Sequence, residues 1–294
     1  MSVDAVPAAR RRRKLDGKNI QAETLCFVIG RPRSGTTVFK AMLQTHPEVW
    51  SLREVLNENN PRSYFNFLRR LQSEDRDALL PSRSVANFVK YLGWCRTTAL
   101  EKQPQNKVVV LDVKYDQAHL LCEPWWSITS LPRIFSLMRE LGCKVIDVHR
   151  NDVVRLVISN QIAIKTQIYH SNKLEPGTGQ EAKVHIDPDR LQREVNATFQ
   201  AYEKVTRHFR GYPGYLQIAY EDMFEGDAFS EALVQRVASF LGISAQFERK
   251  PQLSKLLADD IFSYVENADE VRASLARQEP PRTAVTSAGA TESS

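Results

Sequence analysis

Two glycines, two threonines and two arginines follow the first strongly apolar run of the chain. This run covers Leu25 to Ile29 and predicts a buried strand. The eight residues GRPRSGTT come next, and from Val38 apolar residues recur at helical spacing. A strand, a glycine-bounded loop and a helix start can cradle a phosphate, because loop N–H groups and the helix dipole both favour an anion. The pattern therefore predicts a phosphate site at residues 30–37.

The loop departs from the Walker A pattern G-x-x-x-x-G-K-[ST] at one position. Gly30, Gly35 and Thr37 match the pattern, but Thr36 stands where the lysine belongs. The cation lies inside the loop instead, as Arg33, whose guanidinium can bind two oxygens at once. A kinase normally places the lysine on the β- and γ-phosphates and Mg²⁺ on the hydroxyl. The loop is therefore interpreted as a rearranged phosphate site.

The same residues resemble a known family. The run PRSGTT is similar to the 5′-phosphosulfate loop of sulfotransferases, Pro-(Lys/Arg)-Ser-Gly-Thr-Thr, which binds the donor 3′-phosphoadenosine 5′-phosphosulfate (PAPS). The longer run RPRSGTTVFKAMLQTHPEVWSLREVLN most resembles bacterial carbohydrate sulfotransferases of the Nod-factor and trehalose type. The resemblance implies a PAPS site whose loop contacts come from Arg31, Arg33, Ser34, Gly35, Thr36 and Thr37.

The donor also carries a 3′-phosphate, so the resemblance implies a second anion site. Arg150 follows the strand expected at residues 144–148, and Ser159 lies on the helix expected next. Sulfotransferases use such an Arg…Ser pair for the 3′-phosphate, usually eight residues apart, whereas here the separation is nine. Tyr220 begins the run Tyr-Glu-Asp-Met, which is similar to the family segment whose tyrosine contacts the adenine.

Sulfuryl transfer to a hydroxyl needs a base for the acceptor proton and positive charge around the sulfur. Arg33 is expected to supply part of this charge, and Lys114 is expected to contact the transferred sulfonate. The resemblance to the Nod-factor and trehalose enzymes implies Glu54 as the base, after a short connection from the loop helix. Asp116 remains an open alternative, because it occupies the position of the histidine base in cytosolic aryl and steroid sulfotransferases.

Apolar runs that predict strands alternate with segments of helical spacing. The expected strands are 25–29, 108–114, 144–148 and 215–220, and the clearest helices are 63–72, 84–100, 131–141, 152–169, 191–209 and 228–241. The alternation predicts an α/β fold of the P-loop type, with three αβα layers, a helical cap and a mostly parallel sheet of four to five strands. Ligands of such sheets bind at the carboxyl ends of the strands, where the candidate residues fall.

A single sulfotransferase-like domain is expected over residues 23–277, with a helical cap inserted at 57–105. A disordered basic leader at 1–22, containing RRRRK at 10–14, and a disordered tail at 278–294 are expected to flank it. Gly, Pro and polar residues at 171–187 predict a mobile loop.

Composition narrows the class of protein. With 294 residues, 42% of them apolar, the chain can bury a sizeable core. The net charge of +5 suits an anionic ligand but predicts no nucleic-acid partner. No apolar run reaches 18 residues, so no transmembrane segment is expected. The four scattered cysteines are typical of a cytoplasmic protein and predict neither a disulfide framework nor a metal site.

The sequence thus predicts a cytoplasmic, PAPS-dependent sulfotransferase that needs no metal and acts on a hydroxyl of a carbohydrate or glycolipid. A P-loop nucleotide kinase is one alternative, disfavoured by Thr36 in the lysine position and by the lack of a clear Walker B carboxylate pair. A non-catalytic nucleotide-binding protein is the other. Monomer and homodimer both stay open.

Overall fold

The computed structural model describes residues 20–121, 131–167, 183–251 and 260–277. The expectations for the basic run at 10–14, for the tail at 278–294 and for most of the loop at 171–187 lie outside these residues.

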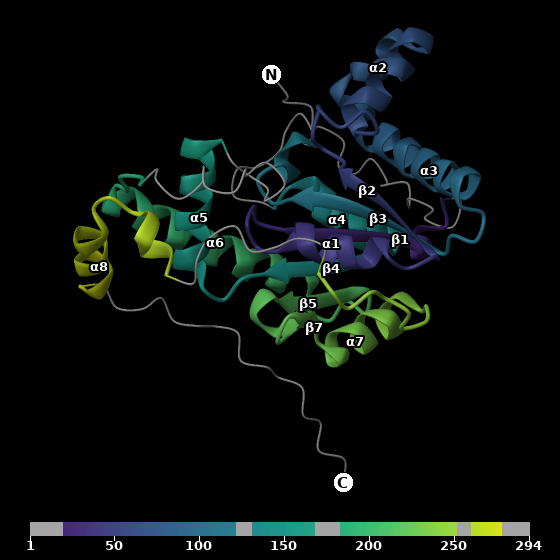
Figure 1. Ribbon diagram of the computed structural model, residues 1–294. Helices are drawn as coiled ribbons and strands as arrows, with labels where there is room; N and C mark the ends of the chain where they lie inside the picture. Colours follow the sequence, from purple (N-terminus) through teal and green to yellow (C-terminus); the bar gives the residue numbers. More distant parts are fainter. Residues whose placement is uncertain (1–19, 122–130, 168–182, 252–259, 278–294) are drawn as a thin grey trace, which may run out of the picture.

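A five-stranded parallel sheet forms the centre of the protein, in the order β2-β3-β1-β4-β5 (Figure 1). Its strands are β1 (Leu25–Gly30), β2 (Val49–Glu54), β3 (Val108–Lys114), β4 (Lys144–His149) and β5 (Tyr215–Ala219). β1 lies in the middle and is buried at every residue, as a central parallel strand covered on both faces must be. The predicted α/β fold is confirmed.

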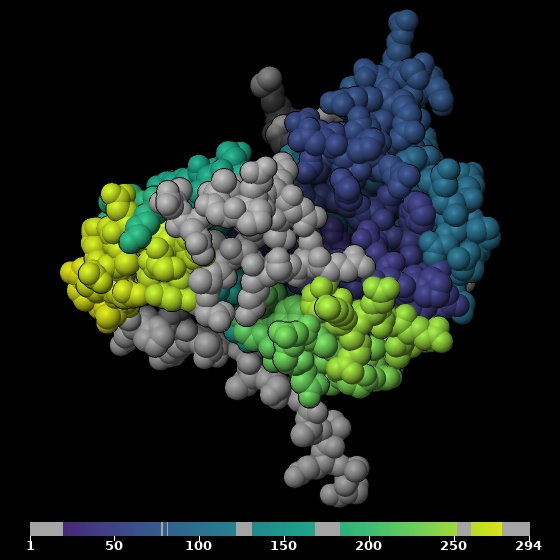
Figure 2. All heavy atoms as spheres, viewed as in Figure 1, coloured from purple at the N-terminus to yellow at the C-terminus, as the bar shows by residue number. Residues whose placement is uncertain are grey.

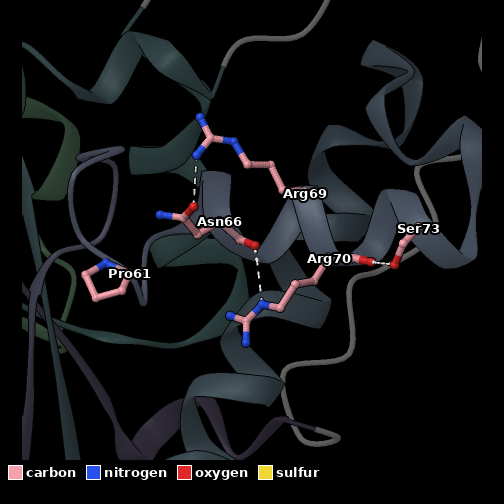
Figure 3. A pocket seen from close by; sticks show the side chains of 5 residues that line it. All are labelled: Pro61, Asn66, Arg69, Arg70 and Ser73. Atoms are coloured by element: carbon pink, nitrogen blue, oxygen red, sulfur yellow. Dashed lines mark hydrogen bonds between the residues drawn. The ribbon is translucent and has the colours of Figure 1, made fainter.

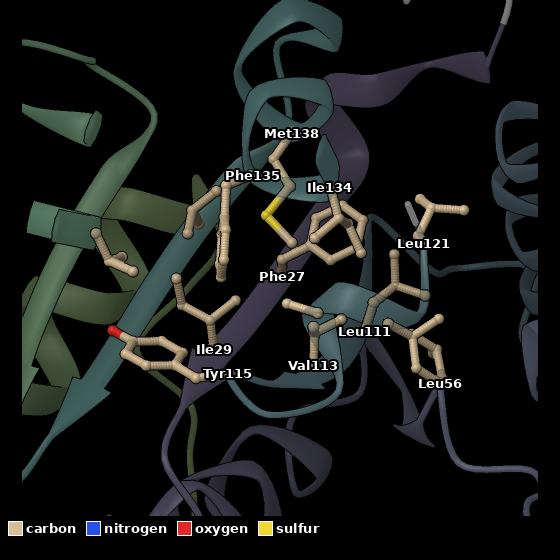
Figure 4. Close-up of a cluster of buried hydrophobic side chains, with 14 of the residues drawn as sticks. Phe27, Ile29, Leu56, Leu111, Val113, Tyr115, Leu121, Ile134, Phe135 and Met138 are labelled. Atoms are coloured by element: carbon tan, nitrogen blue, oxygen red, sulfur yellow. The ribbon is translucent and has the colours of Figure 1, made fainter. Parts of the chain in front are cut away.

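Helices cover both faces of the sheet, and alternate residues of β1 separate the two cores. Cys26 and Val28 face α1 (Thr36–Gln44) and α7 (Glu231–Leu241). Phe27 and Ile29 face the opposite core, whose helical residues come mostly from α3 (Ser84–Lys102), α4 (Arg133–Leu141), α5 (Val153–Thr166) and α6 (Pro188–Phe209). Figure 4 shows part of this second core, where residues of β1 and β3 lie beneath α4. α8 (Ala268–Ala276) packs on α6.

Local signals set the ends of the helices. Ser230 accepts the N–H of Leu233 to cap α7, which ends at Gly242 with a φ of 71°. α6 starts at Pro188, directly after the capping carboxylate of Asp187. These caps satisfy backbone groups that a helix end would otherwise leave unpaired.

The structure adds β2, where the sequence predicted only a short connection between the loop helix and Glu54. β2 is an edge strand in which Val49 and Leu52 are the fully buried residues, so its apolar signal is short. The helix expected at 228–241 begins at Glu231, because Ala228–Phe229 (β7) pairs instead with Phe224–Glu225 (β6).

Two helices occupy the segment expected to form a cap, at the β2 edge of the sheet. α2 (Tyr64–Glu74) starts after Ser63, whose Oγ accepts the N–H of Asn66. Aromatic rings join α2 to α3, with Tyr64 edge-on to Phe88 at 5.4 Å between ring centroids. α2 projects from the body of the protein at the upper right of the space-filling view (Figure 2).

Candidate active site

The loop between β1 and α1 is shaped by close backbone approaches. A side-chain carbon at Gly30 would lie 2.5 Å from the carbonyl oxygen of Val148, and one at Gly35 would lie 2.4 Å from the ring of Tyr220. Gly35 has a φ of 98° and Arg33 a φ of 70°, both in the left-handed region. Both glycines are therefore required by geometry, and the loop turns tightly into the start of α1.

Ser34 lies at the bottom of this loop. Its side chain is fully buried, and its Oγ has no hydrogen-bond partner among the residues that the structure describes. α1 begins two residues later, and the N–H groups of its first turn have no partner within the helix. A buried hydroxyl and free N–H groups at a helix start form a site for ligand oxygens.

The two anion sites predicted from distant parts of the sequence are in contact. The Nε of Arg33 donates to the Oγ of Ser159 on α5 at 3.1 Å. The guanidinium carbon of Arg150, after β4, lies 4.7 Å from the ring centroid of Tyr220. That ring packs in turn against Gly35 of the loop. The fold thus gathers five of the predicted donor-binding residues at the carboxyl ends of β1, β4 and β5.

Positive charge at this site is only partly compensated. The Nε atoms of Arg31 and Arg150 are buried and have no hydrogen-bond partner within the described residues. Glu221 Oε1 lies 3.9 Å from the Arg150 Nε. Burial lowers the pKa of Arg150, and burial together with the charge of Arg150 lowers the pKa of Arg33. An anion bound here would relieve this electrostatic cost.

Glu221 is a positioning residue that the sequence did not reveal. Its carboxylate accepts the backbone N–H groups of Asn151 and Asp152, at distances between 3.0 and 3.2 Å. These residues directly precede α5, so Glu221 ties the segment after β5 to the turn that carries Arg150. The arrangement fixes Arg150 and Tyr220 relative to each other.

Lys114 reaches the loop from the neighbouring strand β3. Its Nζ lies 2.5 Å from the Oγ1 of Thr36, and 2.8 and 2.9 Å from the two carboxylate oxygens of Asp112. Lys40 of α1 forms a second ion pair with Asp112. The hydroxyl that replaces the Walker A lysine is therefore next to an ammonium group supplied by another strand.

A single carboxylate, Asp112, lies inside the otherwise apolar run VVVLDVK of β3. It pairs in register with Val28 of β1, two residues before Gly30. Its oxygens accept from Lys114 and form an ion pair with Lys40, so two ammonium groups surround the carboxylate.

The two candidate bases lie in different surroundings. Glu54 ends β2, and its Oε2 accepts from Gln117 at 2.8 Å and from Asn57 at 3.1 Å. Its Oε1 lies 4.0 Å from the Nζ of Lys114. Asp116 is exposed in the turn after β3. Two side-chain amides thus orient the Glu54 carboxylate. The sequence positions of Asn57 and Gln117 did not predict these contacts.

A hollow of about 500 Å³ lies elsewhere, on the cap, and contains none of the predicted site residues (Figure 3). It is lined by Pro61, Asn66, Arg69, Arg70 and Ser73. Among the described residues, no group of three or more His, Cys, Asp or Glu side chains is arranged to bind a metal ion. Within those residues no helix has the length and apolar character needed to cross a membrane.

Comparison with known protein families identifies the family of the chain. The model of the family described as "Sulfotransferase family" matches residues 26–248, which is most of the chain. No curated protein matches the chain.

Solved structures show distant likenesses. A sulfotransferase from Alicyclobacillus acidocaldarius is 14% identical, with 86% of this chain and 92% of that chain covered and a TM-score of 0.43. The sulfotransferase STF9 from Mycobacterium avium is 12% identical over 92% and 72%, with a TM-score of 0.41. Mouse sulfotransferase SULT7A1 complexed with PAP is 13% identical over 90% and 70%, with a TM-score of 0.37.

Proposed function

The chain belongs to the sulfotransferase family, and from this premise we propose that it transfers a sulfuryl group from PAPS to a hydroxyl of a carbohydrate or glycolipid. The observation that carries the proposal is the group of buried, unpartnered donors around the loop. Ser34 Oγ, Arg31 Nε and Arg150 Nε lack hydrogen-bond partners among the described residues. Such groups are costly unless a ligand satisfies them.

The donor-binding residues fit a nucleotide with two anionic ends. Arg33, Thr36 and Thr37 would hold the 5′-phosphosulfate with the N–H groups at the start of α1. Arg150 and Ser159 would hold the 3′-phosphate. The contact between Arg33 and Ser159 supports this assignment, because both anions are attached to one ribose and need neighbouring sites. Tyr220, beside Arg150 and Gly35, would contact the adenine.

The bound donor supplies the sulfuryl group, whose bond to the 5′-phosphate oxygen breaks as the acceptor oxygen bonds to sulfur. Glu54 takes the proton from the acceptor hydroxyl at its Oε1, the oxygen that Gln117 and Asn57 leave open. Lys114 and Arg33 stabilise the negative charge of the sulfonate oxygens and of the leaving phosphate. Asp116 is the competing base.

The carbohydrate acceptor is proposed from the resemblance of residues 31–57 to the Nod-factor and trehalose enzymes. Glu54 as the base places the reacting hydroxyl near the end of β2, where residues 55–63 lead into α2 of the cap. The cap therefore supplies part of the proposed acceptor site.

Two measurements test the proposal. Titration with 3′-phosphoadenosine 5′-phosphate (PAP) and with ATP/Mg²⁺ should show a clear preference for PAP, whereas a preference for ATP would contradict the proposal and favour a kinase. Radiolabelled sulfate should pass from PAPS into a carbohydrate or glycolipid in a host lysate. PAP binding with no transfer to any acceptor would favour the non-catalytic alternative.

A further inference from the structure

One buried carboxylate beside the loop has two counter-ions. The Asp112 side chain is 1% exposed and pairs with Lys114 of its own strand and with Lys40 of α1, which are 7% and 12% exposed. One ammonium is sufficient to balance one carboxylate. The second ammonium therefore needs a reason, because every buried charge carries a desolvation cost.

The two lysines differ in what else they contact. The Nζ of Lys114 also contacts the Thr36 Oγ1 and lies 4.0 Å from the Glu54 Oε1, so it faces the space in which the sulfonate is proposed to bind. Asp112 is the ion-pair partner identified for Lys40. Lys40 is one helical turn after Thr36 on α1, which places the two residues on the same face of the helix.

An isolated buried carboxylate is strongly unfavourable, and breaking a buried ion pair from one side strands its partner. If Asp112 had Lys114 alone, moving that ammonium toward a ligand would leave the carboxylate uncompensated. With Lys40 in place, Asp112 keeps a counter-ion throughout.

We propose that Lys40 is a positioning residue that releases Lys114 for catalysis: by neutralising Asp112, it allows the Lys114 ammonium to turn from the carboxylate to the sulfonate oxygens of the donor. This inference rests on the proposed function, and specifically on the proposed contact between Lys114 and the sulfonate.

The charge states of the cluster agree with this role. Burial raises the pKa of Asp112, but Lys114 and Lys40 outweigh that effect and hold the pKa below its ordinary value. Burial lowers the pKa of Lys40, while the charge of Asp112 opposes this shift and that of Lys114 adds to it. Glu54 also faces the cluster, and its charge raises the pKa of Lys40, as that of Asp112 does. Asp112 is thus an anion shared by two cations, and either cation alone can balance it.

The test compares Lys40→Met with Lys40→Met/Asp112→Asn, Asp112→Asn, Lys114→Met and Lys40→Arg, and uses Lys204→Met as an exposed control on α6. Methionine keeps most of the lysine volume without the charge. Three quantities are measured for each variant: PAP affinity by titration, kcat with saturating PAPS, and the thermal unfolding midpoint without ligand. The third needs neither donor nor turnover.

Lys40→Met should bind PAP within about twofold of wild type but lose about tenfold or more in kcat, because Lys114 stays on Asp112. Asp112→Asn in the same chain should recover most of the lost kcat, since an amide no longer retains the ammonium. Lys40→Arg should stay near wild type, as should Lys204→Met. A purely structural lysine would lower the unfolding midpoint without this split between affinity and kcat.

Suppose that the wild type transfers sulfate and Lys114→Met does not. Unchanged kcat in Lys40→Met, or no recovery of kcat in the double variant, would then overturn the proposed role of Lys40 and leave the proposed function intact. An active Lys114→Met would instead refute the contact between Lys114 and the sulfonate, and the role of Lys40 with it. The ligand-free midpoints add an independent check. Lys40→Met should lower the midpoint by about 2–4 °C, and Asp112→Asn should cost less in that background than in wild type.

Discussion

The two halves of the candidate site are built in different ways. On the proposed donor side, close approaches to the backbone shape the loop: Gly30 and Gly35 permit approaches that any side chain would block, and Arg33 has a left-handed backbone conformation. On the proposed acceptor side, side-chain amides hold the key residue. Gln117 and Asn57 hold the Glu54 carboxylate, and Asn60 donates to the Glu54 carbonyl at 3.0 Å.

This contrast explains why only one of the two halves has a recognisable sequence motif. A backbone-built loop tolerates few residue types, so its glycines and hydroxyls form a recognisable pattern. An amide-built loop can exchange one donor for another while keeping the same carboxylate in place. We therefore expect changes on the donor side to abolish binding, and changes on the acceptor side to affect turnover or stability while binding persists.

The largest expected effect is on the donor side. Arg150→Ala should weaken PAP binding by about 100-fold or more, because it removes a partly buried cation from the 3′-phosphate. Arg33→Ala should do the same at the loop. Isothermal titration with PAP measures both, and Arg236→Ala on the exposed face of α7 is the matched control. Near-normal PAP affinity in Arg150→Ala would show that Arg150 does not bind the donor. The contrast between the two halves of the site would then lose its main support.

The next effect separates catalysis from binding. Glu54→Gln should reduce kcat by about 100-fold, since the acceptor proton loses its base, while PAP affinity stays unchanged. Asp116→Asn is the matched variant, because it removes the charge of the competing candidate from an exposed turn. Steady-state rates with PAPS distinguish the two. If Asp116→Asn has the large effect and Glu54→Gln has none, the base is Asp116, and the amides around Glu54 serve structure only.

The sequence predicted the central architecture because buried parallel strands are continuous apolar runs. β1 has such a run, β3 and β4 have runs interrupted by one aspartate each, and the predicted helices between them are present. β2 was missed for a physical reason. An edge strand covered on part of its surface needs few apolar residues, and β2 buries only Val49 and Leu52 fully.

The site was predictable only in part. Residues at strand ends could be predicted from the sequence, whereas the polar side chains that position them could not. Loop residues and Arg150 follow strand ends, so a topological rule brings them together. Lys40 and Gln117 are polar residues on a helix and in a turn, where charged and amide side chains are ordinary, and no spacing marks them. Asp112 could have been singled out, since a carboxylate inside a buried strand requires a counter-ion or hydrogen-bond donors, although the sequence does not say which.

A smaller effect is expected within the cap. Asn66 donates to the carbonyls of Glu58 and Asn60 at 2.9 and 2.8 Å, which secures the loop after Glu54. Asn66→Ala should lower the free energy of unfolding by about 1–3 kcal/mol, because the Glu58 carbonyl loses this donor and the Asn60 carbonyl keeps only the Ser63 N–H. It should also reduce kcat more than PAP affinity. Urea unfolding and titration measure these, with the exposed Asn196→Ala on α6 as control. Equal losses of kcat and PAP affinity would show that the cap and the donor side are not separate.

The smallest effect concerns pH and lies where α1 ends, in the scaffold of the donor side. His46 is buried, its Nδ1 accepts the N–H of Glu48 at 3.1 Å, and its ring packs on Phe247. Burial lowers the pKa of His46 below its ordinary value of about 6.5.

Because the pKa of His46 is lower in the folded than in the unfolded state, its contribution to stability is complete above the unfolded-state pKa. The contribution is lost as the pH falls through the folded-state pKa. Wild type should therefore lose more stability than His46→Gln between about pH 7.5 and pH 5, by about 0.5–1.5 kcal/mol. Urea midpoints at the two pH values measure this, with the exposed His185→Gln as control. PAP affinity should change with neither substitution, because His46 follows the C-terminal end of α1, whereas the proposed donor loop adjoins its N-terminal end. A parallel loss of PAP affinity would mean that the loop depends on this distant part of the scaffold.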